Sequence, residues 1–242
     1  MILDNNVIVK DLKKSYGQLE AVKGISFDIK KGEIFALIGP NGAGKTSALR
    51  MVATILKPDA GTIEVCGINA LKEPSKVREL ISYLPEEAGA YKNLTGLGYL
   101  RFMASLFSKN SEDEKKYVTR ASDICDLGDR LNNKIGTYSK GMTRKLLLAR
   151  AVMTSPKLAI LDEPTSGLDV INAMEIRKLI RELANEGMSV LVSSHNMLEI
   201  EFLSDRVSII DHGVIFRTGT PAELKQKNNA GNLEEVFMEV AQ

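Results

Sequence analysis

The chain has 242 residues, of which 44% are hydrophobic, and its 32 lysines and arginines nearly balance its 31 aspartates and glutamates. This composition supports a sizeable core and excludes a disordered chain, while a net charge of +1 gives no reason to expect a nucleic-acid partner. Since no apolar stretch approaches the roughly 18 residues of a membrane helix and the N-terminus lacks a signal pattern, we expect a cytoplasmic chain that reaches a membrane only through a partner.

The N-terminal segment alternates short β-prone runs with turns. Residues 7–9 and 25–29 are such runs, and turns are expected at residues 16–17 and 30–32. This alternation predicts an antiparallel sheet at the start of the chain. Two further short strands are expected at residues 62–66 and 81–84.

The most informative motif is a glycine-rich run between a β-prone segment, residues 34–38, and a helix-prone segment, residues 46–56. In this context the pattern G-x-x-x-x-G-K-[ST] predicts a phosphate-binding loop rather than an ordinary glycine-rich turn. The glycines allow backbone N–H groups to crowd around phosphate oxygens, and the helix N-terminus adds partial positive charge. Lys45 would reach the β- and γ-phosphates, and the Thr46 hydroxyl would ligate Mg²⁺. The predicted nucleotide-binding residues here are Gly39, Pro40, Asn41, Gly42, Ala43, Gly44, Lys45, Thr46 and Ser47.

From about Ala88 to Thr154 the pattern is helical. Thr95 is expected to cap a helix that carries Leu100, Met103 and Phe107 at helical spacing. Residues 111–114 fit a capping box that opens a charge-rich helix, whose charges we interpret as a solvent-exposed face.

Strand character returns at residues 158–161, 189–193 and 206–211, with a helix expected at 172–186 between the first two. Strands that alternate with helices predict an α/β fold with a mostly parallel sheet and helices on both faces. The apolar spacing of residues 233–240 predicts a short C-terminal amphipathic helix that docks on the protein itself.

The strand at 158–161 ends in two acids, Asp162 and Glu163. Carboxylates at the carboxyl end of a buried strand point into the crevice where open α/β sheets bind ligands. We expect Asp162 to hold Mg²⁺, directly or through water, and Glu163 to accept a proton from an attacking water. The alternative, acids that merely end a strand, is weakened by the phosphate loop upstream.

Four further features stand at characteristic distances from the phosphate loop and the two acids. They are Tyr16, the segment Tyr138-Ser139-Lys140-Gly141-Met142, the segment Ser166-Gly167-Leu168-Asp169, and Ser193-Ser194-His195. In order and spacing they resemble the ATP-binding cassette (ABC) ATPases over nearly the whole chain. The resemblance implies one ABC ATPase domain with a P-loop NTPase core. Residues 1–87 and 155–242 would form the core with an N-terminal antiparallel β subdomain, and residues 88–154 an inserted α-helical subdomain.

The resemblance also implies roles within one chain. Tyr16 looks like the aromatic residue that stacks on adenine. Glu86 stands where the family usually has a glutamine that senses the γ-phosphate and the metal. His195 looks like the residue that grips the γ-phosphate and would act with Glu163 and Lys45 in catalysis. His212, in an expected hairpin turn, is interpreted as structural.

Other roles implied by the resemblance need a second chain. Ser139 and Gly141 match the signature loop, which contacts the γ-phosphate of ATP bound to the other subunit. Asp169 matches the loop that crosses the dimer interface.

Two departures from the family pattern are expected to matter. Lys140 and Met142 stand where the signature usually has glycine and glutamine, and lysine resists positive φ, so the loop should be right-handed or extended at Lys140. Glu86 adds negative charge near the triphosphate, which would weaken ATP binding unless Mg²⁺ or Lys45 screens it. Both variants look like those of the ABC-2-type exporter branch of bacteria and archaea, whose ATPase and membrane subunits are separate chains.

The resemblance therefore implies an ATP-hydrolysing subunit that dimerises on ATP, as a homodimer or with an unlike ATPase chain, and drives an integral-membrane permease at the inner face of the cell membrane. Residues 87–107 would either transmit closure to that permease or form the core of the insertion. A non-transport ABC-type ATPase of DNA repair or translation is disfavoured, because the sequence shows no tandem cassette, zinc cysteines or strong basic patch. A phosphotransferase built on the same loop would not explain the signature segment, Asp169 and His195 together.

Overall fold

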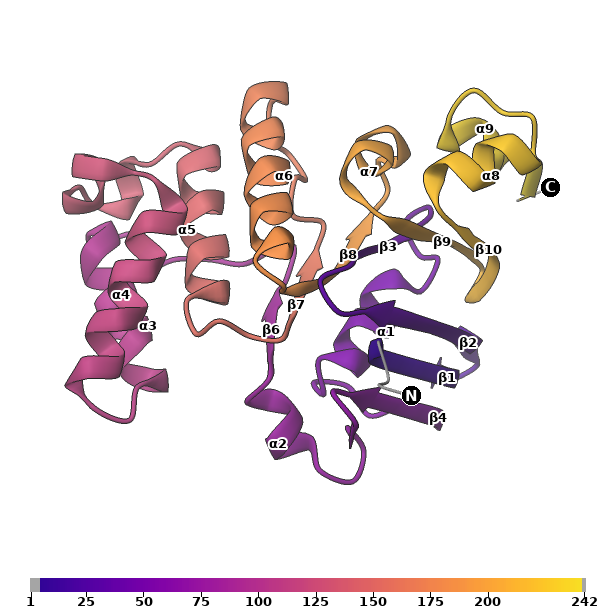
Figure 1. Cartoon of the computed structure of the whole chain (residues 1–242), viewed down its shortest axis with the longest axis horizontal. Coiled ribbons are helices and arrows are strands. Elements are labelled where there is room, and N and C mark those ends of the chain that lie inside the picture. The colour runs from indigo at the N-terminus through magenta and orange to yellow at the C-terminus, as the bar shows by residue number, and fades with distance from the viewer. Residues whose placement is uncertain (1–4, 241–242) are drawn as a thin grey trace.

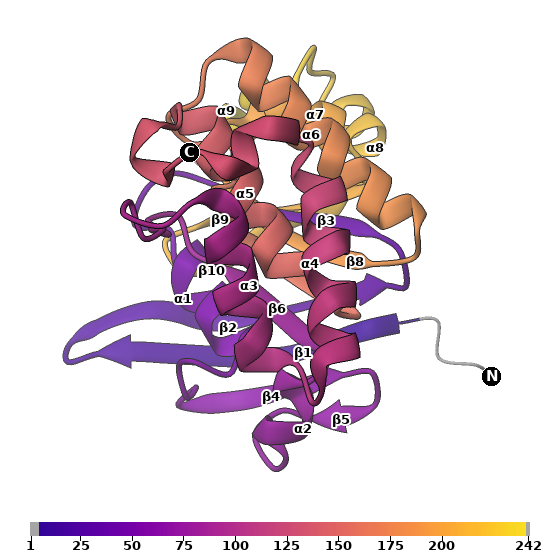
Figure 2. The same cartoon turned by 90° about the vertical axis from the view of Figure 1, so that its left-hand side faces the viewer.

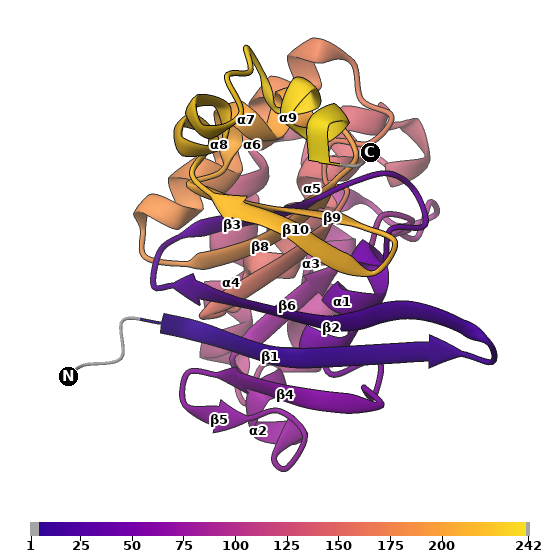
Figure 3. The ribbon, with the colours of Figure 1, turned by 90° about the vertical axis from the view of Figure 1, so that its right-hand side faces the viewer.

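The computed structural model describes residues 5–240, so the first four and last two residues of the predicted domain lie outside it. An antiparallel sheet in the order β2-β1-β4-β5 forms the N-terminal part (Figures 1 and 3). Its core-facing residues alternate along the strands, as in an antiparallel sheet with one buried face. The predicted antiparallel start of the chain is confirmed. The strands are β1 (Asn5–Tyr16), β2 (Leu19–Lys30), β4 (Ala60–Val65) and β5 (Ile68–Asn69).

A six-stranded sheet in the order β10-β9-β3-β8-β7-β6 forms the centre of the molecule. Neighbouring strands from β9 to β6 run parallel, and only β10 is antiparallel to its neighbour. Every residue of β3 and β7 is buried, as expected for central parallel strands covered on both faces. The mostly parallel sheet is confirmed. Its strands are β3 (Ile34–Ile38), β6 (Ile81–Leu84), β7 (Leu158–Asp162), β8 (Ser189–Ser194), β9 (Arg206–Asp211) and β10 (Val214–Gly219).

Two hydrophobic clusters lie on opposite faces of the central sheet. Phe35 and Leu37 of β3 pack with helix α1 (Lys45–Val52) and the antiparallel sheet, whereas Ile34 and Ile38 pack toward α5 (Lys140–Val152) and α6 (Val170–Asn185). Helix α1 ends four residues earlier than the expected boundary at Leu56, because Thr54 adopts a left-handed backbone with φ 59°. A short helix, α2 (Pro74–Arg78), precedes β6.

The predicted helical insertion stands to one side of the sheets (Figures 1 and 2). It consists of α3 (Gly96–Phe107), α4 (Ser111–Cys125) and α5, with short 3₁₀ helices at Gly128–Asn132 and Ile135–Thr137. Thr95 caps α3 as expected, by accepting a hydrogen bond from the Gly98 amide. The predicted cap of α4 was wrong by one residue: Ser111 is already helical, and the Asn110 side chain accepts from the Asp113 amide instead.

The C-terminal helices α7 (Met197–Leu203), α8 (Pro221–Lys227) and α9 (Leu233–Val240) pack together beside β9 and β10 (Figure 3). Leu233 and Val236 of α9 are fully buried, which confirms that this helix docks on the protein itself. Within residues 5–240, no helix is both long enough and apolar enough to span a bilayer.

Candidate functional site

A pocket of about 260 Å³ lies at the carboxyl end of β3, where the phosphate loop leads into α1. Six of the nine predicted phosphate-loop residues line it, together with Tyr16 and with Glu86 and Glu163, which come from segments far away in the sequence. The strand order places these segments side by side, since β3, β8 and β7 are neighbours and β6 follows β7. The pocket is lined by Tyr16, Leu19, Ala21, Asn41, Gly42, Gly44, Lys45, Thr46, Ser47, Glu86 and Glu163.

Two glycines fix the shape of the loop. Gly44 precedes α1 with φ 104°, and a Cβ there would lie 2.4 Å from the Ala21 carbonyl oxygen. A Cβ on Gly39 would lie 1.9 Å from the carbonyl oxygen of Ile210. Only glycine fits this tight path, which brings the loop and the N-terminus of α1 to the pocket, where their N–H groups suit an anion.

Lys45 is the buried cation of the pocket, with 6% of the residue exposed. Its ammonium donates to the carbonyl oxygens of Gly39 at 2.7 Å and Pro40 at 3.0 Å, and its Nζ lies 3.7 Å from Glu163 Oε1. Burial lowers the pKa of Lys45, and the neighbouring carboxylates, Glu163 first, oppose that shift. A polyanion entering the pocket would add to this opposition and favour the charged lysine.

Asp162 is the last residue of β7, and 2% of the residue is exposed. Three hydroxyls donate to its carboxylate: Ser193 at 2.6 Å, Tyr83 at 3.2 Å and Thr46 at 3.3 Å. Burial and Asp162 raise the pKa of Tyr83, which therefore keeps its proton and stays a donor.

The oxygens of Thr46 and Asp162 form a donor set that suits a hard cation such as Mg²⁺. Among the described residues, no group of three or more His, Cys, Asp or Glu side chains could hold a metal without further ligands. Mg²⁺ bound to these two side chains would complete its coordination with oxygens from water and from the substrate.

Glu163 connects the loop to His195. Its Oε2 lies 2.9 Å from His195 Nδ1, and its backbone N–H donates to Ser193 Oγ at 3.1 Å. The residue adopts φ 48°, a left-handed conformation that is uncommon outside glycine. The strained backbone directs the carboxylate toward the pocket between Lys45 and His195.

Two hydrogen bonds hold Glu86 at the pocket. Ser166 Oγ donates to Glu86 Oε1 at 3.1 Å, and Arg144 Nη2 donates to the Glu86 carbonyl oxygen at 3.1 Å. At the opposite edge, Tyr16 is 47% exposed and its hydroxyl lies 3.3 Å from Ser47 Oγ. Sequence reasoning gave no such roles to Tyr83, Ser166 or Arg144.

Ser139, Gly141 and Asp169 do not line this pocket. Ser139 caps α5 by accepting from the Met142 amide, and Asp169 caps α6 by accepting from the Asn172 amide. These bonds from Asn172 lower the pKa of Asp169, which therefore stays ionised. A Cβ on Gly141 would lie 1.9 Å from Asn172 Oδ1, so the two caps are close neighbours. Lys140 begins α5, in agreement with the expected right-handed backbone.

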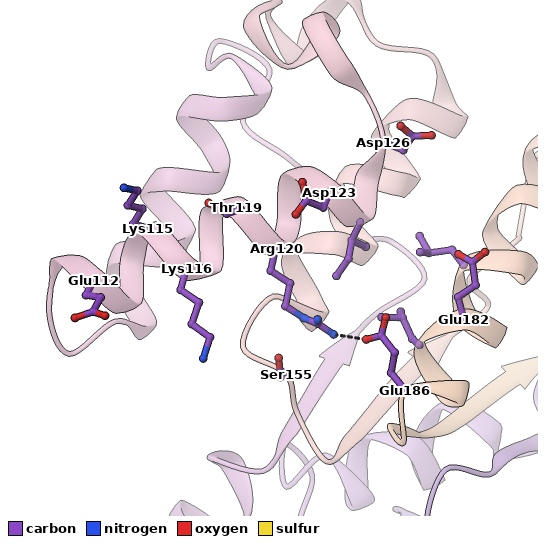
Figure 4. A pocket seen from close by; sticks show the side chains of 13 residues that line it. Glu112, Lys115, Lys116, Thr119, Arg120, Asp123, Asp126, Ser155, Glu182 and Glu186 are labelled. Carbon is purple, nitrogen blue, oxygen red and sulfur yellow. Dashed lines mark hydrogen bonds and ion pairs between the residues drawn. The ribbon is translucent and has the colours of Figure 1, made fainter.

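A larger cavity, of about 1030 Å³, lies between α4 and the C-terminal end of α6 (Figure 4). Charged side chains dominate its lining, and an ion pair between Arg120 and Glu186 crosses it at 2.9 Å. It contains none of the predicted site residues.

Comparisons with known proteins show the family to which this chain belongs. The family profile described as ABC transporter matches residues 22–166. The linearmycin resistance ATP-binding protein LnrL of Bacillus subtilis (strain 168) is 39% identical over 215 residues, which cover 89% of this chain and 69% of LnrL. A solved ATP-binding subunit of an ABC transporter is 27% identical with a TM-score of 0.84, over 98% of this chain and 99% of that chain.

The fold also matches a dimeric ATP-binding cassette solved in a post-hydrolysis state with ADP and phosphate. That chain is 24% identical with a TM-score of 0.78, and the match covers 88% of this chain and 98% of the other. The chain belongs to the ABC transporter family. It is an ATP-binding subunit of that family and an ATPase.

Proposed function

We propose that this subunit works as one of a pair, in which each ATP lies between the Lys45 loop of one chain and the Ser139 loop of the other. The observation that carries this proposal is the division of the predicted residues. Glu163, which lines the pocket, contacts both Lys45 and His195, whereas Ser139 and Asp169 cap helices outside the pocket. One chain then supplies half of the phosphate contacts and a second ATPase chain, identical or not, supplies the rest.

Within each half, the residues have separable tasks. The loop amides and Lys45 bind the phosphates, Tyr16 stacks on adenine, and Thr46 and Asp162 hold Mg²⁺, with Glu86 close by. Mg²⁺ neutralises charge on the phosphates when it is bound. Glu163 accepts the proton of the attacking water, and His195 both orients Glu163 through its Nδ1 contact and holds the γ-phosphate.

The membrane partner would contact the helical insertion. Leu100 and Ala104 of α3 are fully buried, so the apolar residues of this helix include the core of the insertion. The same insertion also exposes large apolar side chains, and Tyr91 packs edge-on against Phe102 with ring centroids 5.8 Å apart. Both of the functions considered for residues 87–107 thus have support, on different faces. The exposed side chains are Tyr91, Phe102, Leu106 and Phe107.

We propose that the partner is an integral-membrane permease and that the subunit lies at the inner face of the cell membrane through it. Export, rather than import, is supported by the name of LnrL, which assigns that relative to linearmycin resistance. The family profile, described as ABC transporter, and this relative disfavour a role in DNA repair or translation.

Glu163→Gln tests the proposal. The variant keeps the shape of the side chain but removes the base, so ATP turnover should fall by about 10²-fold or more. ATP should then hold the two chains together, which size-exclusion chromatography with light scattering would detect as an ATP-dependent dimer. Glu87→Gln, at an exposed glutamate that does not line the pocket, is the matched control and should turn over ATP normally. Unchanged phosphate release from Glu163→Gln would remove the base role, and a variant that stays monomeric with ATP would contradict the shared site.

A further inference from the structure

Glu86 brings an extra negative charge to a pocket built for a polyanion. Its side chain lines the pocket with Lys45 and Glu163, and Ser166 Oγ holds its Oε1 at 3.1 Å. Ser166 follows Glu163 closely in the chain, so this hydrogen bond places the Glu86 carboxylate at the edge of the pocket. A carboxylate at this position repels the triphosphate unless a positive charge offsets it.

Arg144 is placed to provide that charge. It lies on the second turn of α5, the helix that Ser139 caps, and its Nη2 donates to the Glu86 carbonyl oxygen at 3.1 Å. The guanidinium borders a cavity of about 300 Å³ at the start of α5, which Ser166 also lines. The same Ser166 therefore touches Glu86 on one side and faces the Arg144 cavity on the other.

The partly buried environment of Arg144 is unfavourable for a charged side chain. Its Nη1 is buried and has no hydrogen-bond partner among the described residues. Burial lowers the pKa of Arg144, and the negative charge of Glu86 opposes that shift. An apolar side chain of similar length would fill the same space without leaving a buried donor unpaired.

We propose that Arg144 is a positioning residue for Glu86: its guanidinium fixes the Glu86 backbone and offsets the negative charge that Glu86 adds beside the triphosphate. The inference rests on the proposed function, because it assumes that the phosphates bind at the Lys45 loop. Through this contact, helix α5, which Ser139 caps and which carries Arg144, is connected to the phosphate pocket within one chain. The acid at position 86 and the arginine at 144 then act as a matched pair.

A double-mutant cycle tests the pair. The affinity for a fluorescent ATP analogue with Mg²⁺, and the KM and kcat for ATP, would be measured for Arg144→Gln, Glu86→Gln and the double variant. Arg144→Gln should weaken nucleotide binding about fivefold, because it removes a positive charge that opposes Glu86, and this loss should be absent when position 86 carries glutamine. The double variant should bind like Glu86→Gln, since removing the acid removes the need for the arginine.

Two further variants separate charge from packing. Arg144→Lys keeps the charge and should bind the nucleotide within about threefold of the original protein. Arg150 lies on the same helix and also has a buried nitrogen without a partner among the described residues. Arg150→Gln should therefore lower the melting temperature. Any effect of this variant on nucleotide affinity should persist when Glu86→Gln is added.

Additive effects in the cycle would overturn the proposal, as would equal losses in Arg144→Lys and Arg144→Gln. If Arg144→Gln fails to fold both with Glu86 and with Gln at position 86, the arginine serves packing alone and the proposal is also wrong. These outcomes leave the proposed function intact as long as the unmodified protein hydrolyses ATP. Failure of the unmodified protein to bind the analogue would instead contradict the proposed function.

Discussion

The two regions that carry the family motifs are built in different ways. Around the phosphate loop, polar side chains are buried and bonded to one another: Asp162 and Glu163 are 2% and 5% exposed, and three hydroxyls converge on Asp162. At the starts of α5 and α6, Ser139 and Asp169 are bonded to the first turns of their own helices. The first region is preorganised within one chain, whereas the second presents helix N-termini whose geometry is set locally.

Ser139 can cap α5 and still donate a hydrogen bond. Its oxygen accepts one hydrogen bond from the Met142 amide, and the hydroxyl hydrogen remains available for another acceptor. The N-terminus of a 13-residue helix also favours an anion nearby. This region therefore suits a phosphate from outside the chain, as the proposed shared site requires.

The strongest test of the preorganised region is Lys45→Ala. Removing the buried cation should lower ATP turnover by about 10²- to 10³-fold, comparable to the loss of one precisely placed donor in other active sites. Phosphate-release assays would measure the change, and Lys31→Ala, at an exposed lysine just before β3, is the control. If Lys45→Ala keeps more than half of the original turnover, the phosphates do not bind at this loop.

Ser139 variants test the locally built region and should have an intermediate effect. Ser139→Ala should lower turnover at least about tenfold through loss of a phosphate donor, and should lower the free energy of unfolding by about 1 kcal/mol through loss of the cap. Ser139→Asp restores a good cap but places a carboxylate toward the phosphate, so stability should recover while turnover stays low. Urea unfolding and phosphate release measure the two quantities. Normal turnover in Ser139→Asp would exclude contact between this residue and ATP.

The smallest effect is expected outside both regions, at the cavity between α4 and the C-terminal end of α6 (Figure 4). The side chains of Arg120 and Glu186 are 29% and 57% exposed, so their ion pair is weakened by solvent and worth about 0–1 kcal/mol. Arg120→Met keeps the apolar stem and should change the free energy of unfolding by less than about 1 kcal/mol, with unchanged ATP turnover. A large loss of turnover in this variant would show that the cavity takes part in the ATPase cycle.

Features that depend on local sequence were predicted, whereas contacts that depend on the order of strands in the sheet were not. The prediction of the strands, and of a loop and a helix after β3, depends on local order in the chain, and the structure confirms these elements. The same local order placed the acids at the end of β7 beside the pocket. The contacts of Asp162 with Tyr83 and Ser193 depend on β6, β7 and β8 being neighbours, which no local pattern reveals. The cap of α4 moved by one residue, to Asn110, because several adjacent polar side chains can serve and packing decides among them.

At Glu163, the left-handed backbone means that the residue best for stability differs from the residue proposed for ATP turnover. A residue with a side chain costs about 1–2 kcal/mol in this conformation, and glycine adopts it freely. The change that would most readily relax the fold here is therefore also the one that deletes the carboxylate on which hydrolysis is proposed to depend. On the proposed role of Glu163, selection for stability alone would remove ATP hydrolysis by a change at this one residue.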